Sequence, residues 1–307
     1  MAKPTLPEDV LRAALDREFA IDARALAPVQ RGIDTAAAGL RVRASDGREW
    51  FAKLRRGRFA ESALAFAAFL AESGIREVVG PVATRDGRRC AALGELELAV
   101  YPFAPGANGL DVGLSEAHWL ALGRALRRIH AVALPAALAA RIRRDGPTRF
   151  AGALRKLLAE NAPPLAAHRA RLERALDRFE RGFADLRARP RPLAPCHSDV
   201  HAGNLLLADD GGVAIVDWDE PILAPRERDW IFVAGGYYGN RCAPEQEEAL
   251  FRRGYGDVAL DPLVRGAYAC ERVVEDLVGH YEEGTAESLG RVANILAPGG
   301  TLDRALA

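Results

Sequence analysis

The segment PCHSDVHAGN, residues 195–204, carries the densest group of chemically versatile side chains in this sequence. His197, Asp199 and His201 alternate along it, and neutral imidazoles with a carboxylate can hold zinc. Asp199 and Asn204 are also separated by four residues, which is the spacing of a phosphoryl-transfer loop with a proton-accepting Asp and a metal-binding Asn. The segment alone leaves both interpretations open, together with a third in which its polar groups only satisfy backbone atoms.

The residues that follow predict a β-hairpin. Two apolar runs, LLL and VAIV, flank the sequence ADDGG, and an Asp-Gly pair between apolar runs is typical of a hairpin turn. Pairing Leu207 with Val213 across the turn brings Asn204 and Asp217 to the same open end, and Asp199 lies on the loop that enters it. Carboxylate and amide oxygens are ligands that Mg²⁺ prefers. The hairpin therefore favours phosphoryl transfer, whereas a zinc hydrolase would leave the amide and the second carboxylate unexplained.

A nucleotide site of this kind needs a cation for the phosphates. The chain has no GxxxxGK[ST] motif, so a P-loop is excluded. Lysine is rare here and occurs only as Lys3, Lys53 and Lys156. Lys53 lies in EWFAKL, a predicted strand, where a flexible point charge suits the phosphates of ATP. Glu61, at the start of the next predicted helix, is expected to orient that lysine.

These motifs together resemble a known family. HSDVHAGN, then IVDWDE, then RERDW, preceded by a lysine-bearing strand, is similar to the aminoglycoside phosphotransferase family of small-molecule kinases. The resemblance extends from about residue 27 to residue 283. Within the family, WDEPILAPRERDW and YACERVVEDL are most similar to spectinomycin phosphotransferases, which phosphorylate an aminocyclitol hydroxyl.

The resemblance implies a role for each residue of the motifs. Asp199 is implied as the catalytic base, Asn204 and Asp217 as Mg²⁺ ligands, and Lys53 as the contact to the ATP phosphates. Further nucleotide contacts are expected from Glu61, from Gly32 in a phosphate-covering turn, and from Phe103 and Ala104 in the hinge that receives adenine.

A cationic aminocyclitol requires acidic groups close to the base. Asp219 and Glu220 immediately follow the expected metal ligand and are the first candidates. Glu271 and Glu275 are four residues apart on a predicted helix and therefore share a face. That acidic run is also consistent with an ordinary solvated helix face.

The pattern of elements predicts a small sheet-bearing lobe followed by a larger helical lobe, and the resemblance implies an α+β, bilobal, protein-kinase-like fold. We expect a nucleotide-binding lobe at residues 1–103 and a catalytic and substrate-binding lobe at 104–307, joined by a linker at 104–109. Strand-like runs occur at 26–34, 39–44, 49–54, 77–84, 89–94 and 96–103, and helical runs at 60–73, 115–132, 148–160, 165–188, 244–254 and 262–283.

Composition narrows the possible partners. Lys plus Arg equals Asp plus Glu, at 42 each, and this lack of a basic excess argues against a nucleic-acid partner. The four cysteines form no CxxC pair, which favours a reduced, cytoplasmic protein. The N-terminal residues have no long apolar core, so neither a signal peptide nor a membrane span is expected. We expect a monomer or weak dimer.

The sequence thus predicts an ATP- and Mg²⁺-dependent O-phosphotransferase for an aminocyclitol or aminoglycoside antibiotic, an activity that could confer resistance. Only eleven residues separate Asp217 from Asp229, and none carries a hydroxyl, so a phosphorylatable activation loop has no room. Three alternatives stay open: a kinase of another metabolite such as choline, a hydroxy amino acid or a sugar; a non-catalytic nucleotide-binding pseudokinase; and, weakest, the zinc hydrolase.

Overall fold

The computed structural model describes residues 3–29, 36–145, 150–239 and 241–307. The chain divides into two compact units that are not contiguous in sequence. Unit 1 consists of Met1–Ala107, Ala133–Ile142 and Asn204–Pro221, and unit 2 of Asn108–Val132, Arg143–Gly203 and Ile222–Ala307. A lobe boundary at residues 104–109 stays a prediction.

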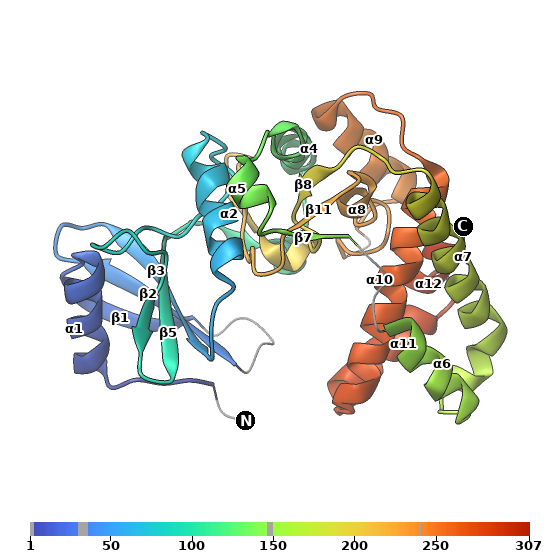
Figure 1. Ribbon diagram of the computed structural model, residues 1–307, viewed down its shortest axis with the longest axis horizontal. Helices are drawn as coiled ribbons and strands as arrows, with labels where there is room; N and C mark the ends of the chain where they lie inside the picture. The colour runs from blue at the N-terminus through green and yellow to red at the C-terminus, as the bar shows by residue number, and fades with distance from the viewer. Residues whose placement is uncertain (1–2, 30–35, 146–149, 240) are drawn as a thin grey trace. The chain divides into compact units, whose positions relative to one another are not determined.

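Unit 1 is built on a five-stranded antiparallel sheet (Figure 1). Its spatial order is β1 (Ala23–Val29), β2 (Ala37–Ala44), β3 (Glu49–Arg56), β5 (Leu96–Pro102) and β4 (Ala91–Leu93). The mixed α/β architecture with an antiparallel N-terminal sheet confirms the predicted fold class. The predicted strand at 77–84 is wrong, because only Val78 forms an isolated bridge there and Gly80-Pro81 interrupts the run.

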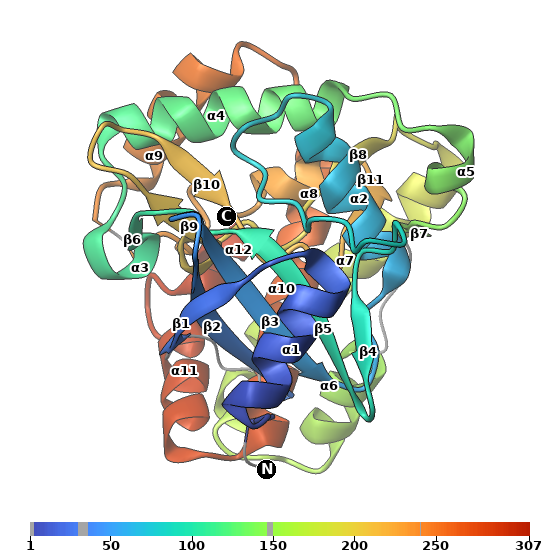
Figure 2. The same cartoon turned by 90° about the vertical axis from the view of Figure 1, so that its left-hand side faces the viewer.

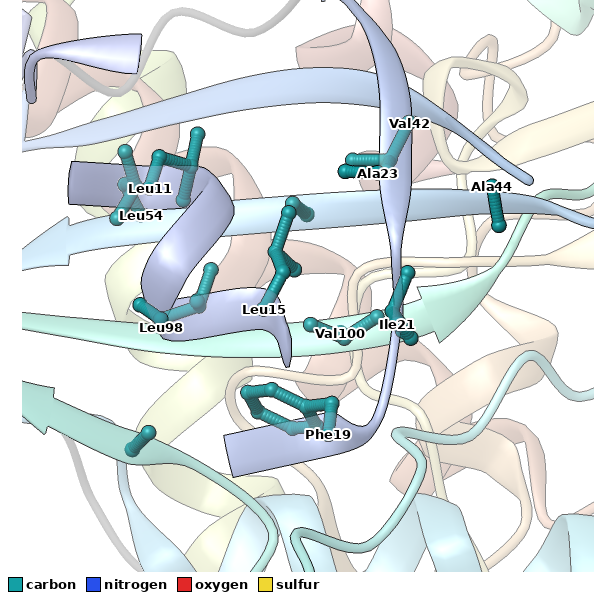
Figure 3. Close-up of a cluster of buried hydrophobic side chains, with 13 residues drawn as sticks. Leu11, Leu15, Phe19, Ile21, Ala23, Val42, Ala44, Leu54, Leu98 and Val100 are labelled. Carbon is teal, nitrogen blue, oxygen red and sulfur yellow. The ribbon is translucent and has the colours of Figure 1, made fainter. Parts of the chain in front are cut away.

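Helix α1 (Glu8–Phe19) covers one face of this sheet (Figure 2). Leu11, Leu15 and Phe19 recur every four residues and therefore lie on one stripe of the helix. In Figure 3 these side chains approach those of the strands, including Leu54 and Val100. The resulting hydrophobic core anchors β3 and β5 on the α1 side of the sheet.

The opposite face of the sheet packs against α2 (Glu61–Glu72). Leu64 of α2 contacts a cluster with Phe59 and Ala99, and Tyr101 packs at its edge. Side chains alternate between the two faces of a strand, so Ala99 and Tyr101 lie on the face opposite α1. Helix α5 (Ala136–Ala139) also belongs to unit 1 and packs near α2.

The predicted hairpin is confirmed, and it completes unit 1. Strands β9 (Leu205–Leu207) and β10 (Val213–Ile215) are antiparallel, with Leu207 opposite Val213 as the turn chemistry predicted. Gly106 lies close to this hairpin at φ +136°, and a Cβ built there would be 2.8 Å from the Leu207 carbonyl oxygen. Glycine at that position therefore has both a backbone and a packing reason.

Unit 2 is mostly helical. Its small sheet has β11 (Ile222–Ala224) in the centre, flanked by β7 (Arg143–Arg144) and β8 (Ala194–Cys196). Its longest helix, α10 (Pro262–Glu283), packs against α6, α7, α8, α11 and α12. The other helices of the unit are α3 (Gly109–Val112), α4 (Glu116–Ala131), α6 (Phe150–Ala159), η1 (Leu165–His168), α7 (Arg169–Ala188), α8 (Glu227–Trp230), α9 (Pro244–Tyr255), α11 (Ala286–Leu296) and α12 (Thr301–Leu306). The short strand β6 (Ala107–Asn108) and the 3-10 turn η2 (Ala202–Asn204) lie where the chain passes between the units.

The predicted helices of this region are found in place. For example, the Pro at the first position of α10 and the Asp261 cap, whose side chain accepts from Leu263 and Val264 N–H groups, fix the start of that helix. Gly284 ends it in the left-handed conformation at φ +65°. The helix is thus defined at both ends by local sequence.

Candidate active site

Lys53 lies on the face of the sheet opposite α1. Its neighbours in the strand, Ala52 and Leu54, are buried in the α1 core, so alternation turns Lys53 to the other side. Its partner in the ladder is Ala99 of β5. The lysine is therefore presented on the face that also carries Tyr101.

Two carboxylates of the hairpin segment hold the Lys53 ammonium. Its Nζ lies 2.8 Å from Oδ1 of Asp217 and 2.9 Å from Oδ2 of Asp219. The Lys53 side chain is only 15% exposed. Burial lowers its pKa, but the two carboxylates outweigh this and hold the pKa above its ordinary value. We call Lys53, Asp217 and Asp219 the Lys53 cluster.

The end of the hairpin determines where these carboxylates point. The backbone N–H of Val216 donates to the carbonyl of Asn204 at 3.0 Å, so the two strands stay paired up to the residue before Asp217. The Trp218 indole N–H donates to the Ile215 carbonyl at 3.0 Å and anchors the chain beyond. Asp217 itself has φ +65°, a conformation that is costly for a non-glycine residue and concentrated at functional sites.

Glu61 has a different partner from the one expected. Its side chain is 77% exposed and forms an ion pair with Arg141 at 2.9 Å. Lys53 is instead oriented by Asp217 and Asp219. Asp219 follows Asp217 by two residues, so both carboxylates reach the lysine from one short segment. Asp219, expected at the substrate, thus contacts Lys53, and it also pairs with Arg55 at 3.2 Å.

The other expected nucleotide contacts stay predictions. The backbone N–H of Phe103 donates to the Glu49 carbonyl at 3.1 Å, so that donor already has a partner. Ala104 follows it at the end of β5. Gly32 lies outside the described residues.

In unit 2, Asp229 organises the loop that carries the expected base. Its carboxylate accepts hydrogen bonds from the backbone N–H groups of His197, at 3.0 Å, and Ser198, at 2.7 Å. The same carboxylate lies 3.0 Å from Nε2 of His130. Ser198 has φ +69°, and the buried hydrogen bond compensates for that strained backbone. Burial raises the pKa of Asp229, but these hydrogen bonds outweigh it and the pKa is lowered.

The histidines of the segment bind backbone groups. Nδ1 of His197 accepts from the Asp199 N–H at 3.2 Å, and Nδ1 of His201 accepts from the Gly203 N–H at 3.0 Å. Burial lowers the pKa of His201, although Asp199 opposes this effect. A neutral His201 whose Nδ1 accepts carries its proton on Nε2. Both imidazoles thus shape the loop.

Asp199 is paired with a cation from a distant helix. Its Oδ1 lies 2.8 Å from Nη1 of Arg272 in α10. Arg272 also reaches Asp276, one turn further along that helix, at 2.9 Å. We call Asp199, Arg272 and Asp276 the Arg272 cluster. Local sequence does not predict this contact, because it depends on how α10 packs.

Comparison with known proteins decides the family. The chain matches the Phosphotransferase enzyme family over residues 30–270. It belongs to this family. No curated protein sequence matches the chain.

Among solved structures, a spectinomycin phosphotransferase in complex with ADP and spectinomycin is similar over 99% of both chains, with 26% identity and a TM-score of 0.82. An amicoumacin kinase in complex with AMP-PNP and Ca²⁺ covers 97% of this chain and 94% of its own, with 15% identity and a TM-score of 0.68. A macrolide 2'-phosphotransferase from Brachybacterium faecium covers 95% and 99%, with 23% identity and a TM-score of 0.59. The predicted resemblance and the predicted enzyme class, a small-molecule phosphotransferase, are confirmed.

The acidic residues expected at the substrate differ in their surroundings. Glu271 is 1% exposed and forms a buried ion pair with Arg228. This argues against Glu271 as a direct substrate ligand, since its carboxylate is committed to the interior of unit 2. Glu275 is half-buried and Glu220 is exposed, and their roles stay predictions.

The alternative zinc site finds no support in the part of the chain that the structure describes. There, the candidate metal-ligand atoms that cluster belong to His130, Cys196 and Asp229, and not to the alternating residues of the loop. Burial raises the pKa of the Cys196 thiol well above its ordinary value, so that group is a poor ligand.

No helix among the described residues is long and apolar enough to cross a membrane.

The oxygen donors of unit 1 fit a hard cation better. Asp217 offers a half-exposed carboxylate, and Asn204 immediately precedes strand β9 of the same hairpin. Such donors, together with phosphate oxygens, suit Mg²⁺.

Proposed function

We propose that this phosphotransferase transfers the γ-phosphate of ATP to a hydroxyl of an aminocyclitol antibiotic of the spectinomycin type. The observation that carries the proposal is the Lys53 cluster, in which a strand lysine meets Asp217 across 164 residues of sequence. A cation and a carboxylate so arranged fit the phosphates of a nucleotide and their metal ion. The similarity to a spectinomycin phosphotransferase complex over 99% of the chain supports this acceptor class.

Each of the motif residues has one role in the proposed reaction. The Asp199 carboxylate accepts the proton of the substrate hydroxyl as its oxygen forms a bond to the γ-phosphorus, and the bond from that phosphorus to the bridging oxygen breaks to release ADP. Lys53 would bind phosphate oxygens, and Asn204 and Asp217 would hold Mg²⁺. When bound, Mg²⁺ offsets the negative charge of the phosphates.

The nucleotide sets the state of the Lys53 cluster. Without phosphates, the ammonium neutralises Asp217 and Asp219. With Mg-ATP bound, Asp217 would hold Mg²⁺ in place of the ammonium, and Lys53 would contact the phosphates. A lysine suits this exchange because its charge sits on a flexible stem.

The acceptor is tested by ADP release with Mg-ATP against spectinomycin, streptomycin, hygromycin B, kanamycin, choline and homoserine. We expect strong turnover with spectinomycin and little with the others. Turnover with choline or homoserine instead would identify a metabolite kinase. No ADP release with any compound of the panel, although ATP still binds, would contradict the proposed acceptor class.

A further inference from the structure

Arg272 occupies an unusual position for a charged side chain. It lies in the middle of α10, the helix that packs against five others of unit 2, and its side chain is only 18% exposed. Exposed arginines commonly form weak, mobile ion pairs. Arg272 is held on several sides instead.

Three contacts fix its guanidinium group. Oδ1 of Asp199 lies 2.8 Å from Nη1, and Oδ1 of Asp276 lies 2.9 Å from Nε. The Phe232 ring centroid is 5.5 Å from Cζ, within the range of a cation–π contact. These two contacts are ion pairs, since neither Nε of Arg272 nor Oδ1 of Asp199 meets the facing group in hydrogen-bond geometry. A planar guanidinium with carboxylates at two edges and a ring beside it still has little freedom to move.

The contact distinguishes the two oxygens of Asp199. Oδ1, which faces Arg272, is buried, although the side chain as a whole is 39% exposed. The exposure therefore falls mainly on the side of Oδ2. That oxygen lies 3.7 Å from Nε2 of His201, which is longer than a hydrogen bond. An ion pair at Oδ1 therefore sets the direction in which the rest of the carboxylate points.

We propose that Arg272 is a positioning residue for Asp199: it fixes the carboxylate through Oδ1 so that Oδ2 faces the acceptor hydroxyl, and Asp276 and Phe232 hold Arg272 in place for this task. The inference rests on the proposed function, because it takes Asp199 as the base. General-base catalysis depends on heavy-atom geometry at hydrogen-bond distance, so loss of orientation slows the chemical step more than it weakens binding.

The first experiment compares Arg272→Gln with Arg265→Gln. Arg265 lies on the same helix and pairs with Glu248 at 3.0 Å, so its variant controls for the loss of an ion pair from α10. We expect Arg272→Gln to lower kcat about 100-fold with the KM for Mg-ATP little changed, which is the order of cost of a small misplacement at a reacting group. Arg265→Gln should keep the wild-type kcat. Equal kcat values for the two variants would overturn the proposal.

Conservative and indirect variants separate positioning from folding. Arg272→Lys keeps a charge that can reach Oδ1, so it should recover part of the lost kcat. Asp276→Asn leaves Arg272 present but removes one of its anchors, and it should lower kcat by a smaller factor. If Arg272→Gln fails to fold, the Asp276→Asn variant tests the proposal instead. A wild-type kcat in a folded Asp276→Asn variant would contradict the role of Asp276 in holding Arg272.

A double-mutant cycle with Asp199→Asn tests the route of the effect. If Arg272 acts through Asp199, Arg272→Gln should cost little further kcat once the base is gone. An equal, additive loss in both backgrounds would mean that Arg272 acts on the phosphoryl group or the substrate directly, and would overturn the proposal. If Asp199→Asn kept a near-normal kcat, Asp199 would not be the base. If Asp199→Asn had a low kcat but Arg272→Gln had a normal one, only the positioning role of Arg272 would be refuted.

Discussion

The two units each hold a cation between two aspartates, and the cations differ. In unit 1 the Lys53 ammonium bridges Asp217 and Asp219, which come from one short segment after the hairpin. In unit 2 the Arg272 guanidinium bridges Asp199 and Asp276, which come from a loop and from its own helix.

The choice of lysine in one cluster and arginine in the other matches the role that we propose for each. A lysine is a mobile point charge that can leave its carboxylates for phosphate oxygens, as nucleotide binding requires. An arginine with a fork of fixed donors keeps its geometry, which suits a carboxylate that must present one oxygen to a substrate. We therefore expect the Lys53 cluster to be rearranged by nucleotide and the Arg272 cluster to persist.

The largest effect is expected at Asp199, the carboxylate of the Arg272 cluster that we propose as the base. Asp199→Asn should lower kcat by about 10²–10⁴-fold, the usual contribution of a general base, because the amide cannot accept the hydroxyl proton. Nucleotide affinity, measured by calorimetry with ATP, should be largely retained. Asp209→Asn, in the exposed hairpin turn, is the matched control and should keep wild-type turnover.

The loop that carries Asp199 depends on a second buried carboxylate. Asp229→Asn should reduce the free energy of unfolding at neutral pH by about 2–3 kcal/mol, since hydrogen bonds to a charged acceptor are weakened. Chemical denaturation at several pH values measures this. If the variant were as stable as the wild type at neutral pH, Asp229 would not support the loop.

The pH dependence of that cost has a defined sign. The pKa of Asp229 is lower in the folded state than its ordinary value of 3.8. Its carboxylate therefore contributes fully to the free energy of unfolding above pH 3.8, and this contribution is lost as the pH falls through the folded-state pKa. The difference in the free energy of unfolding between wild type and Asp229→Asn should therefore become smaller below about pH 4. A gap that widened in acid would contradict the lowered pKa.

A smaller effect is expected at the cation of the Lys53 cluster. Lys53→Ala should raise the KM for Mg-ATP about tenfold or more, because a charged contact to the phosphates is lost. Initial rates at varied ATP measure it, with Lys156→Ala as a control, since Lys156 is exposed on α6. Wild-type kinetics for Lys53→Ala would contradict the nucleotide role of the cluster.

The smallest effect is expected at Glu61. Its exposed ion pair with Arg141 contributes little, and Lys53 has its carboxylates elsewhere. Glu61→Gln should keep a KM for Mg-ATP close to that of the wild type, measured in the same assay. A rise as large as that of Lys53→Ala would restore Glu61 as the residue that orients the lysine.

Local sequence was enough to predict the hairpin and the strand lysine. The Asp-Gly turn and the apolar runs around it determine the pairing of Leu207 with Val213, since both lie within a few residues of each other. The place of Lys53 on β3 likewise follows from alternation along one strand.

Contacts between distant segments were not predictable in the same way. The partner of Asp199 lies 73 residues later, on a helix whose rotation is set by packing against its neighbours. The periodicity of α10 predicts the helix and shows that Glu271 and Glu275 share a face, but it does not reveal which face is buried. For this reason Glu271 was expected at the substrate, whereas it is paired with Arg228 in the interior.

The most direct test of the account is analysis of the reaction products. Wild-type protein is incubated with Mg-ATP and spectinomycin, and both ADP and the mass of the antibiotic are followed over time. The account predicts a spectinomycin phosphate monoester formed in equal amount to ADP, and its loss in Asp199→Asn. ADP formed without any change in spectinomycin, or phosphorylation at the wild-type rate by Asp199→Asn, would contradict it.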